Sequence, residues 1–337
     1  MLELQTRVVP GALPAGAAAG HVLGGACLGP APAGSPPGWP LQSIFAPLPG
    51  STATGLHELW LASGPCTAGC SEGIAWRRGD GMLYGVCEIA EADFPGTGDR
   101  SPLQAASHAA YRRIFRLLAA ERVPHLWRAW NYFADINGES HGLERYRQFN
   151  IGRQDAFLEF HRGATGNVPA ACAIGLAGGP LRIAFMAGER AATALENPRQ
   201  VSAYHYPADY GPRSPTFSRA MLASLADQEI LFVSGTASIV GHRTVHAGDA
   251  VAQCREVLAN IGAVVEAANQ VRRSAAYAPD ALSYRVYLRH AADLAGVADV
   301  LATHLGAAAD IVFVQADICR ADLLLEIEAT GLHPLAG

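Results

Sequence analysis

The spacing of apolar residues changes several times along the chain, and each spacing predicts a different element. Residues 101–121 give the clearest helix: Ser101 suits an N-cap, Pro102 suits the first helical position, and the run ends before Pro124. Residues 143–162 are expected to be helical in part. Short apolar runs predict strands at 41–45, 59–61, 83–86, 126–133 and 181–186.

After about residue 220 the spacing becomes regular. An apolar stripe predicts a long amphipathic helix over 250–268, and a second helix is expected over 296–304. Strands are expected at 230–234, 284–288, 311–314 and 323–328. This order predicts a compact α+β unit of about 100 residues in which two helices cover one sheet.

The composition excludes every reaction mechanism that needs a lysine. The chain has 337 residues, half of them hydrophobic, which suffices for about two domains with large cores. All 25 basic residues are arginine. No Schiff-base lysine and no Walker lysine is therefore available, and bound anions must be held by arginine, histidine, hydroxyl or backbone N–H groups. A high-GC genome explains much of this bias.

Net charge, apolar segments and cysteine spacing indicate which partners and ligands the protein is not expected to bind. The net charge is −5 without a basic tract, so we expect no nucleic-acid partner. The first 35 residues lack the features of a signal peptide, and the apolar stretch 168–181 is too short to span a bilayer, which predicts a cytoplasmic protein with no membrane contact. Neither Cys66 with Cys70 nor His242 with His246 has the further ligands that a metal site needs, so no metal is expected.

Five uncommon strings, spread over about residues 55–330, resemble the chorismatase family. They are RYRQFNIGR (145–153), GATGNVPAACAIG (163–175), NPRQVSAYHYPADYGPRSP (197–215), SGTASIVGHRTVH (234–246) and QADICRADLLLEIEA (315–329). The resemblance implies an α+β protein made of two YjgF/Rid-like (chorismate-mutase-like) halves: a decorated, degenerate N-terminal domain over 1–220 and a C-terminal domain over 221–337 with the catalytic acid. It further implies chorismate as substrate and no cofactor, and it leaves monomer and trimer both open.

Glu326 is the candidate acid. Strand alternation places Glu326 and Glu328 on one face of the last strand, and the pattern alone favours solvent exposure for both. The resemblance instead identifies Glu326 as the acid that protonates the enolpyruvyl methylene of chorismate, and leaves Glu328 at the surface. Protonating carbon needs a carboxyl that stays neutral, with a pKa raised by roughly 2–3 units through burial.

Substrate carboxylates call for arginine, whose planar group binds them in bidentate fashion. Arg320 is either such a clamp or an ion-pair partner of Asp317 or Asp322. Aromatic and proline-rich segments supply the other candidates for the substrate-binding wall, namely Tyr146, Arg153, Arg199, Tyr204, Tyr210 and Arg213.

Cys319 bears on the product. In the chorismatase family, which this sequence resembles, members with cysteine at the position of Cys319 form a hydroxybenzoate. Members with a small residue that has no thiol there hydrolyse chorismate instead. The sequence therefore favours pyruvate and 3-hydroxybenzoate, with 4-hydroxybenzoate as a second product. A small buried residue without chemistry is the alternative role of Cys319. Alternative functions are hydrolysis to a dihydroxycyclohexadiene carboxylate, a YjgF-like imine deaminase, and a binding module for aromatic acids.

Overall fold

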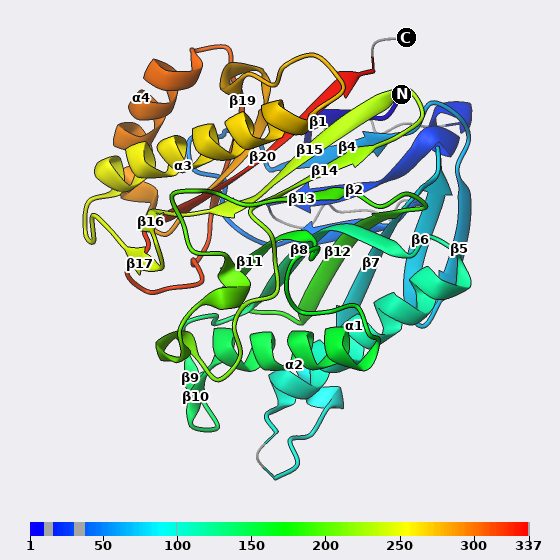
Figure 1. The fold of residues 1–337 in the computed structure, drawn as a ribbon, viewed down its shortest axis with the longest axis horizontal. Helices are drawn as coiled ribbons and strands as arrows, with labels where there is room; N and C mark the ends of the chain where they lie inside the picture. Colours follow the sequence, from blue (N-terminus) through cyan, green and yellow to red (C-terminus); the bar gives the residue numbers. More distant parts are fainter. Residues whose placement is uncertain (10–15, 30–37, 99, 336–337) are drawn as a thin grey trace.

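The structure is a computed structural model, and it describes residues 1–9, 16–29, 38–98 and 100–335. Two six-stranded sheets dominate it (Figure 1). The elements of the first half are β5 (Thr67–Ser71), β6 (Ile74–Gly79), β7 (Met82–Ile89), α1 (Pro102–Ala120), β8 (His125–Ala134), α2 (Arg145–Glu159), β11 (Ala170–Leu176) and β12 (Leu181–Gly188). Those of the second half are β13 (Thr193–Leu195), β14 (Ala220–Ser224), β15 (Gln228–Thr236), α3 (Ala250–Val271), β18 (Ser283–Leu288), α4 (Leu294–Leu305), β19 (Asp310–Gln315) and β20 (Leu325–Pro334).

The two halves repeat one topology. Each runs through three strands, a helix, a strand, a helix and two strands. The sheet orders β11-β8-β12-β7-β6-β5 and β19-β18-β20-β15-β14-β13 correspond strand for strand, and in each the only parallel pair joins the strands around the second helix. The boundary placed after residue 220 falls inside β14, whose partner strand β13 begins at Thr193, so the second sheet begins before that boundary.

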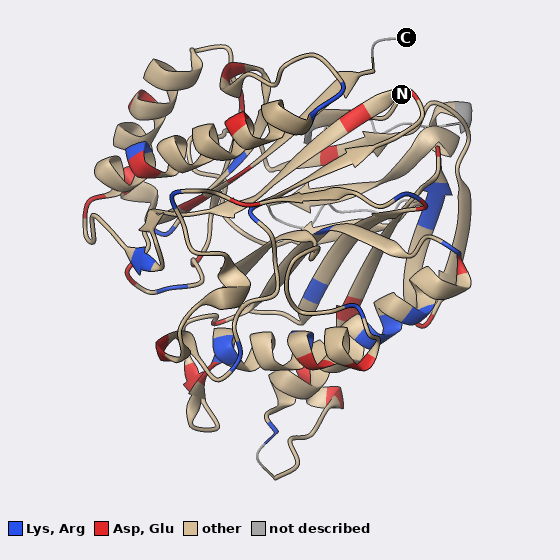
Figure 2. Cartoon of the chain, in the orientation of Figure 1, with Lys and Arg blue, Asp and Glu red and all other residues tan. Residues whose placement is uncertain are grey.

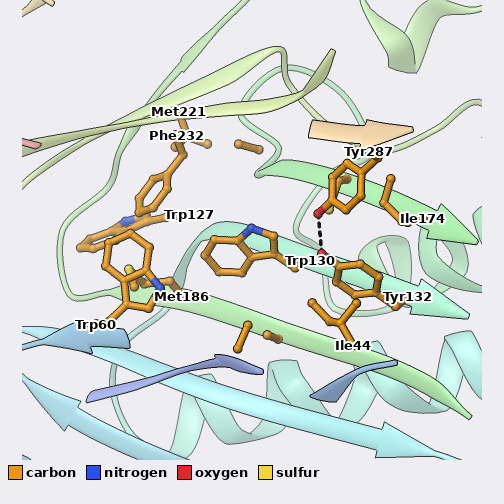
Figure 3. Close-up of a cluster of buried hydrophobic side chains, with 14 of the residues drawn as sticks. Ile44, Trp60, Trp127, Trp130, Tyr132, Ile174, Met186, Met221, Phe232 and Tyr287 are labelled. Atoms are coloured by element: carbon orange, nitrogen blue, oxygen red, sulfur yellow. Dashed lines mark hydrogen bonds between the residues drawn. The ribbon is translucent and has the colours of Figure 1, made fainter. Parts of the chain in front are cut away.

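Helices cover the outer face of each sheet, and the inner faces lie toward each other (Figure 1). One apolar cluster fills the space between the first sheet and α1 and α2, and another that between the second sheet and α3 and α4. A third lies between the sheets, where Trp130 of β8 contacts Phe232 of β15 at a ring-centroid distance of 6.3 Å (Figure 3). This inter-sheet layer fixes how the two halves meet.

A four-stranded sheet precedes the repeat, in the order β1-β4-β2-β3. Its strands are β1 (Glu3–Val9), β2 (Val22–Leu28), β3 (Leu41–Ile44) and β4 (Gly55–Leu61). Trp60 of β4 packs on Trp130, with ring centroids 6.4 Å apart, and Gln42 of β3 donates a hydrogen bond to the Trp130 carbonyl at 3.0 Å. This sheet is the decoration of the first half, and it brings Glu58 to the inter-sheet layer.

The main helices agree with their sequence signals. The Ser101 hydroxyl accepts a hydrogen bond from the Gln104 N–H at 3.2 Å, which confirms the predicted N-cap of α1. Asp249 caps α3 in the same way, through the Ala252 N–H at 2.9 Å. Within the described residues, none of the helices combines the length and apolar character needed to cross a bilayer. Figure 2 shows acidic and basic residues interspersed over both halves.

Two short hairpins complete the fold. One consists of β9 (Glu139–Ser140) and β10 (Leu143–Glu144), directly before α2. The other consists of β16 (Ile239–Val240) and β17 (Arg243–Thr244), directly before α3. The Arg320 guanidinium donates to the His242 carbonyl of this second hairpin at 3.0 Å, so the hairpin helps to hold Arg320 beside the functional site.

Candidate active site

A cavity of about 1050 Å³, counted with its open mouth, lies where the two halves meet. The first half contributes α2, the residues just before it, and β11. The second half contributes β15, β20, and the segments before β14 and β20. Its polar and aromatic lining includes Glu144, Tyr146, Arg147, Arg153, Cys172, Tyr206, Tyr210, Arg219, Cys319, Arg320 and Glu326. Neither half forms the site alone.

Glu326 lies on β20, on the face turned away from α3 and α4. Its neighbours Leu325 and Ile327 fill the apolar cluster under those helices, while Glu326 lines the cavity and is 3% exposed. Burial, and after it the neighbouring Glu328 carboxylate, raise the pKa of Glu326 to about 8 against the opposing effects of Arg128 and Arg219. A carboxyl with this pKa is largely protonated at neutral pH.

A β-bulge makes room for the Glu326 carboxyl. Between Val233 and Thr236, β15 has one more residue than the matching stretch of β20. Gly235 lies in this bulge and lines the cavity. Any Cβ at Gly235 would lie 1.8 Å from Oε1 of Glu326, so the observed carboxyl position requires glycine there.

Four arginines line the cavity; Arg147 is paired with Glu144, and the other three give the cavity its positive charge. Arg153 and Arg219 are buried, at 2% and 4% exposure, and Arg320 is half-buried. Nε of Arg153, Nε of Arg219 and Nη2 of Arg320 are buried with no hydrogen-bond partner among the residues that the structure describes. Since buried donors in proteins are nearly always paired, these N–H groups indicate a site for an anionic ligand.

Aromatic rings hold two of these arginines in place. The Arg320 guanidinium carbon lies 4.0 Å from the ring centroid of Tyr210. Nη2 of Arg219 donates to the Tyr206 hydroxyl at 2.8 Å. The two tyrosine rings pack on each other with centroids 5.3 Å apart, and they form one wall of the cavity.

Cys319 lies beside the acid. Its Sγ is 4.0 Å from Oε2 of Glu326. Burial raises the pKa of the Cys319 thiol to about 12, with a further contribution from Glu326. The thiol is therefore protonated at neutral pH, which makes it a weak hydrogen-bond donor rather than a nucleophile.

Six of the predicted site residues line this one cavity, although they come from segments almost 180 residues apart in sequence. They are Tyr146, Arg153, Tyr210, Cys319, Arg320 and Glu326. Arg320 pairs with neither of the aspartates considered above: Asp317 pairs with Arg289, and Asp322 accepts from Thr244.

The other three predicted residues are not among the cavity lining. Arg199 instead pairs with Glu256 and donates to Asn260 of α3. Tyr204 packs edge-on against His205 and against the apolar cluster under α1 and α2. Arg213 is exposed and lies 3.8 Å from Asp155. Residues of one segment turn in different directions, because the segment is folded into short 3-10 turns.

Sequence reasoning missed several lining residues. Tyr206 lies inside a string that we quoted, but alternation does not apply in an irregular segment. Arg219 lies four residues after the end of that string and carries no signal of its own. Glu328 was expected at the surface, and this is wrong: it is 5% exposed and paired with Arg128 and Arg285.

No cluster of three or more His, Cys, Asp or Glu side chains suited to a metal ion occurs among the described residues. The two histidines with metal-like spacing have other contacts. His242 packs on Tyr210 with centroids 5.8 Å apart, and Nε2 of His246 lies 3.9 Å from Glu256.

Fold and site together define a class of protein: a duplicated α+β chain with a buried carboxylic acid in an arginine-rich cavity between its halves. The comparisons agree. Residues 58–187 match the family described as chorismatase FkbO/Hyg5-like, N-terminal. The chain is 42% identical over 281 residues to a chorismatase of Streptomyces rapamycinicus, covering 80% of each chain. It is 38% identical over 290 residues to a 3-hydroxybenzoate synthase of Streptomyces hygroscopicus, covering 82% of each.

A solved structure agrees over the whole chain. A chorismatase crystal structure superposes with a TM-score of 0.85 at 33% identity, covering 100% of this chain and 98% of that one. The chain belongs to the chorismatase family, and it is an enzyme that acts on chorismate.

Proposed function

We propose that this enzyme converts chorismate to pyruvate and 3-hydroxybenzoate, with Glu326 as the general acid. The observation that carries the proposal is the buried Glu326 carboxyl, whose pKa is raised to about 8 by burial and by Glu328, in a cavity lined by four arginines. An acid that is neutral at physiological pH can protonate carbon, whereas an ordinary exposed glutamate is ionised there.

The arginines would bind the two carboxylates of chorismate. Arg153, Arg219 and Arg320 each have a buried nitrogen without a partner, and together they supply enough donors for two carboxylates. Their contacts with Tyr206, Tyr210 and Asn150 hold them before substrate arrives, which lowers the entropic cost of binding.

The reaction would then proceed in three steps. Glu326 transfers its proton to the enolpyruvyl methylene carbon, giving an oxocarbenium ion. The C4 hydroxyl oxygen attacks C3 and breaks the C3–O ether bond, so pyruvate leaves with the ether oxygen as its keto oxygen, and the hydroxyl proton returns to the Glu326 carboxylate. The resulting arene oxide opens, and loss of a ring proton to its oxygen gives the hydroxybenzoate. Every atom of chorismate appears in the two products, so no co-reactant is needed.

Cys319 would act on the last step. Its protonated thiol, with the pKa raised to about 12 by burial, can donate a hydrogen bond to the epoxide oxygen as the ring opens. Opening toward the other carbon would give 4-hydroxybenzoate as a minor product. Attack by water instead of the C4 hydroxyl is the alternative, and it would give a dihydroxycyclohexadiene carboxylate with pyruvate.

Incubation of the purified enzyme with chorismate tests the proposal. We expect pyruvate and 3-hydroxybenzoate in equal amounts, separated by chromatography and identified by mass. Pyruvate with the dihydroxy acid in place of an aromatic acid would select the hydrolytic alternative. A reaction that yields no pyruvate would refute the proposed function.

A further inference from the structure

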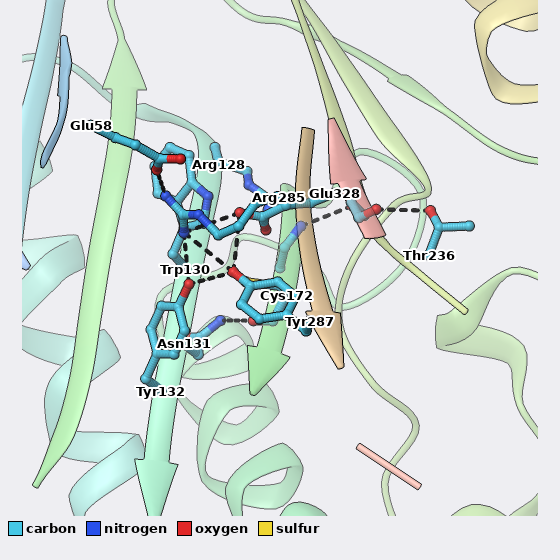
Figure 4. Close-up of polar contacts among 12 residues, drawn as sticks. Glu58, Arg128, Trp130, Asn131, Tyr132, Cys172, Thr236, Arg285, Tyr287 and Glu328 are labelled. Carbon is cyan, nitrogen blue, oxygen red and sulfur yellow. Dashed lines mark hydrogen bonds and ion pairs between the residues drawn. The ribbon is translucent and has the colours of Figure 1, made fainter. Parts of the chain in front are cut away.

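A cluster of buried charges lies between the three sheets (Figure 4), and it includes Glu328, two residues beyond Glu326 on β20. We call it the inter-sheet charge cluster. It consists of Glu58 of β4, Arg128 and Tyr132 of β8, Arg285 and Tyr287 of β18, and Glu328 of β20. Apart from the effect of Glu328 on the pKa of Glu326, these six residues take no part in the reaction described above.

Glu328 is the member with the most complete set of partners. One carboxylate oxygen, Oε2, pairs with Arg128. The other, Oε1, lies 3.2 Å from Nη1 of Arg285 and accepts a hydrogen bond from the Tyr287 hydroxyl at 3.2 Å. Both carboxylate oxygens of Glu328 therefore face cationic or phenolic donors.

Arg285 links this anion to the N-terminal sheet. Its guanidinium pairs with Glu58 as well as with Glu328, and it donates to the Tyr132 hydroxyl at 2.7 Å. Figure 4 shows Arg285 between the two carboxylates. The four charged side chains are all buried, at 2% to 8% exposure, so their charges are poorly screened by solvent.

Glu326 has the opposite environment, although it lies on the same face of the same strand. Among the described residues, the polar contact found for its carboxyl is the weak one to the Cys319 thiol at 4.0 Å, and no arginine forms an ion pair with it. Two neighbouring carboxyl groups with such different surroundings are expected to take different protonation states.

We propose that Glu328 is a positioning residue for the reaction: as an anion fixed by Arg128 and Arg285, it holds the neighbouring Glu326 carboxyl in the protonated form. This role builds on the proposed function, in which Glu326 is the acid. It assigns the inter-sheet charge cluster a purpose that packing alone does not require, since buried ion pairs are often no more stabilising than apolar residues of the same size.

The other titratable groups around Glu326 are of two kinds. Neutral groups come from α2, β11, β18 and the segment before β20, and they are Tyr146, Cys172, Tyr287 and Cys319. Burial raises the pKa of each, so they carry no charge at neutral pH. The cations are Arg128 of β8 and Arg219, which lies directly before β14, and both favour ionised Glu326. Glu328 is therefore the one fixed charge, among the described residues acting on Glu326, that favours its protonated form.

Glu328→Gln is the direct test, read as the dependence of kcat/KM for chorismate on pH. Removing the anion leaves Arg128 and Arg219 unopposed, so the pH at which activity falls should drop by roughly 1–3 units. Activity should be reduced near neutral pH and recover toward the wild-type value in more acidic buffer. An equal loss of activity at every pH, with the midpoint unmoved, would show a merely structural role and overturn the proposal.

Two further variants separate the effect of charge on the pH midpoint from the effect of packing. Arg128→Gln combined with Glu328→Gln removes one charge of each sign, so the midpoint should return toward that of the wild type. Glu58→Gln removes a buried carboxylate that contacts Arg285 from the far side, and its midpoint should remain close to the wild-type value. A double variant that keeps the shifted midpoint of Glu328→Gln would contradict the charge argument.

A measurement on the unaltered cluster covers the case in which these variants fail to fold. Carbon-13 NMR of glutamate-labelled wild-type protein should show one carboxyl that is neutral at about pH 7, and its signal should be missing in Glu326→Gln. Finding Glu326 ionised at neutral pH would refute the proposal. This readout needs no turnover, so it remains decisive even if chorismate were not cleaved.

Discussion

Oε1 of Glu326 occupies the place where a Cβ of residue 235 would otherwise lie, 1.8 Å from the ideal Cβ position on Gly235. The bulge in β15 and the acid on β20 are therefore parts of one arrangement. The bulge turns the backbone of Gly235, which has no side chain, toward the Glu326 carboxyl. The carboxyl therefore has room in an otherwise close-packed layer.

Gly235→Ala should displace the acid without removing it. Because a misplacement of about 1 Å can cost on the order of 10²-fold in rate, we expect kcat for chorismate to fall by about that factor while KM changes less. Steady-state kinetics measure this. Gly262→Ala in α3, where a Cβ meets no atom within 4 Å, is the matched control and should keep wild-type kinetics. Unchanged kcat in Gly235→Ala would show that the carboxyl has another productive position.

The wild-type enzyme should lose activity as the pH rises through about 8. In the proposed mechanism the active form carries the proton on Glu326, whose pKa burial and Glu328 raise to about 8, so kcat/KM should fall tenfold per pH unit above that value. A pH series in buffers of constant ionic strength measures the slope and midpoint. A profile that stays flat up to about pH 9 would contradict an acid with this pKa.

Glu326→Gln should abolish turnover and also change how stability depends on pH. A carboxyl whose pKa is raised from 4.5 to about 8 by burial stabilises the fold fully below pH 4.5, and this contribution is lost as pH rises through about 8. Each pKa unit corresponds to about 1.4 kcal/mol, so glutamine should stabilise the protein by a few kcal/mol at about pH 9 relative to its effect near pH 5. Urea unfolding at both pH values measures the difference, and an equal effect at both would contradict the raised pKa.

Arg219→Gln should weaken substrate binding. Arg219 is buried and lines the cavity, and a hydrogen bond to a charged group contributes about 1.5–3 kcal/mol, so KM for chorismate should rise by about 10- to 100-fold. Arg213→Gln is the control, because Arg213 is exposed and lies outside the cavity lining, and its KM should change by less than about twofold. Equal effects of the two variants would show that net charge, not position, governs binding.

Cys319→Ala should alter the products more than the rate. The thiol lies 4.0 Å from the Glu326 carboxyl but is not the acid, so pyruvate release should stay within about tenfold of wild type. The share of 3-hydroxybenzoate should fall in favour of 4-hydroxybenzoate or the dihydroxy acid. Chromatography of the products measures this, with Cys70→Ala at an exposed thiol as control. An unchanged product ratio would assign Cys319 to packing alone.

Local signals in the sequence were sufficient to locate the main helices and strands. Caps and apolar stripes located α1 and α3, because helix ends need side-chain partners and helix faces need burial wherever they occur. The resemblance identified Glu326 as the candidate acid and pointed to six of the residues that line the cavity. The strand pattern also placed Glu326 and Glu328 on one face, since alternation is a property of any strand.

Which face is buried, and against what, was decided by tertiary structure. The first sheet covers the face of β20 that the pattern assigned to solvent, so Glu328 is buried and paired with Arg128, and burial raises the pKa of Glu326. Arg199 and Arg213 belong to the same string as Tyr210, yet irregular turns direct them elsewhere. The sequence by itself determined the helices, the strands and the chemical groups. The packing of two sheets decided the protonation states, because these depend on charges and burial contributed by distant segments.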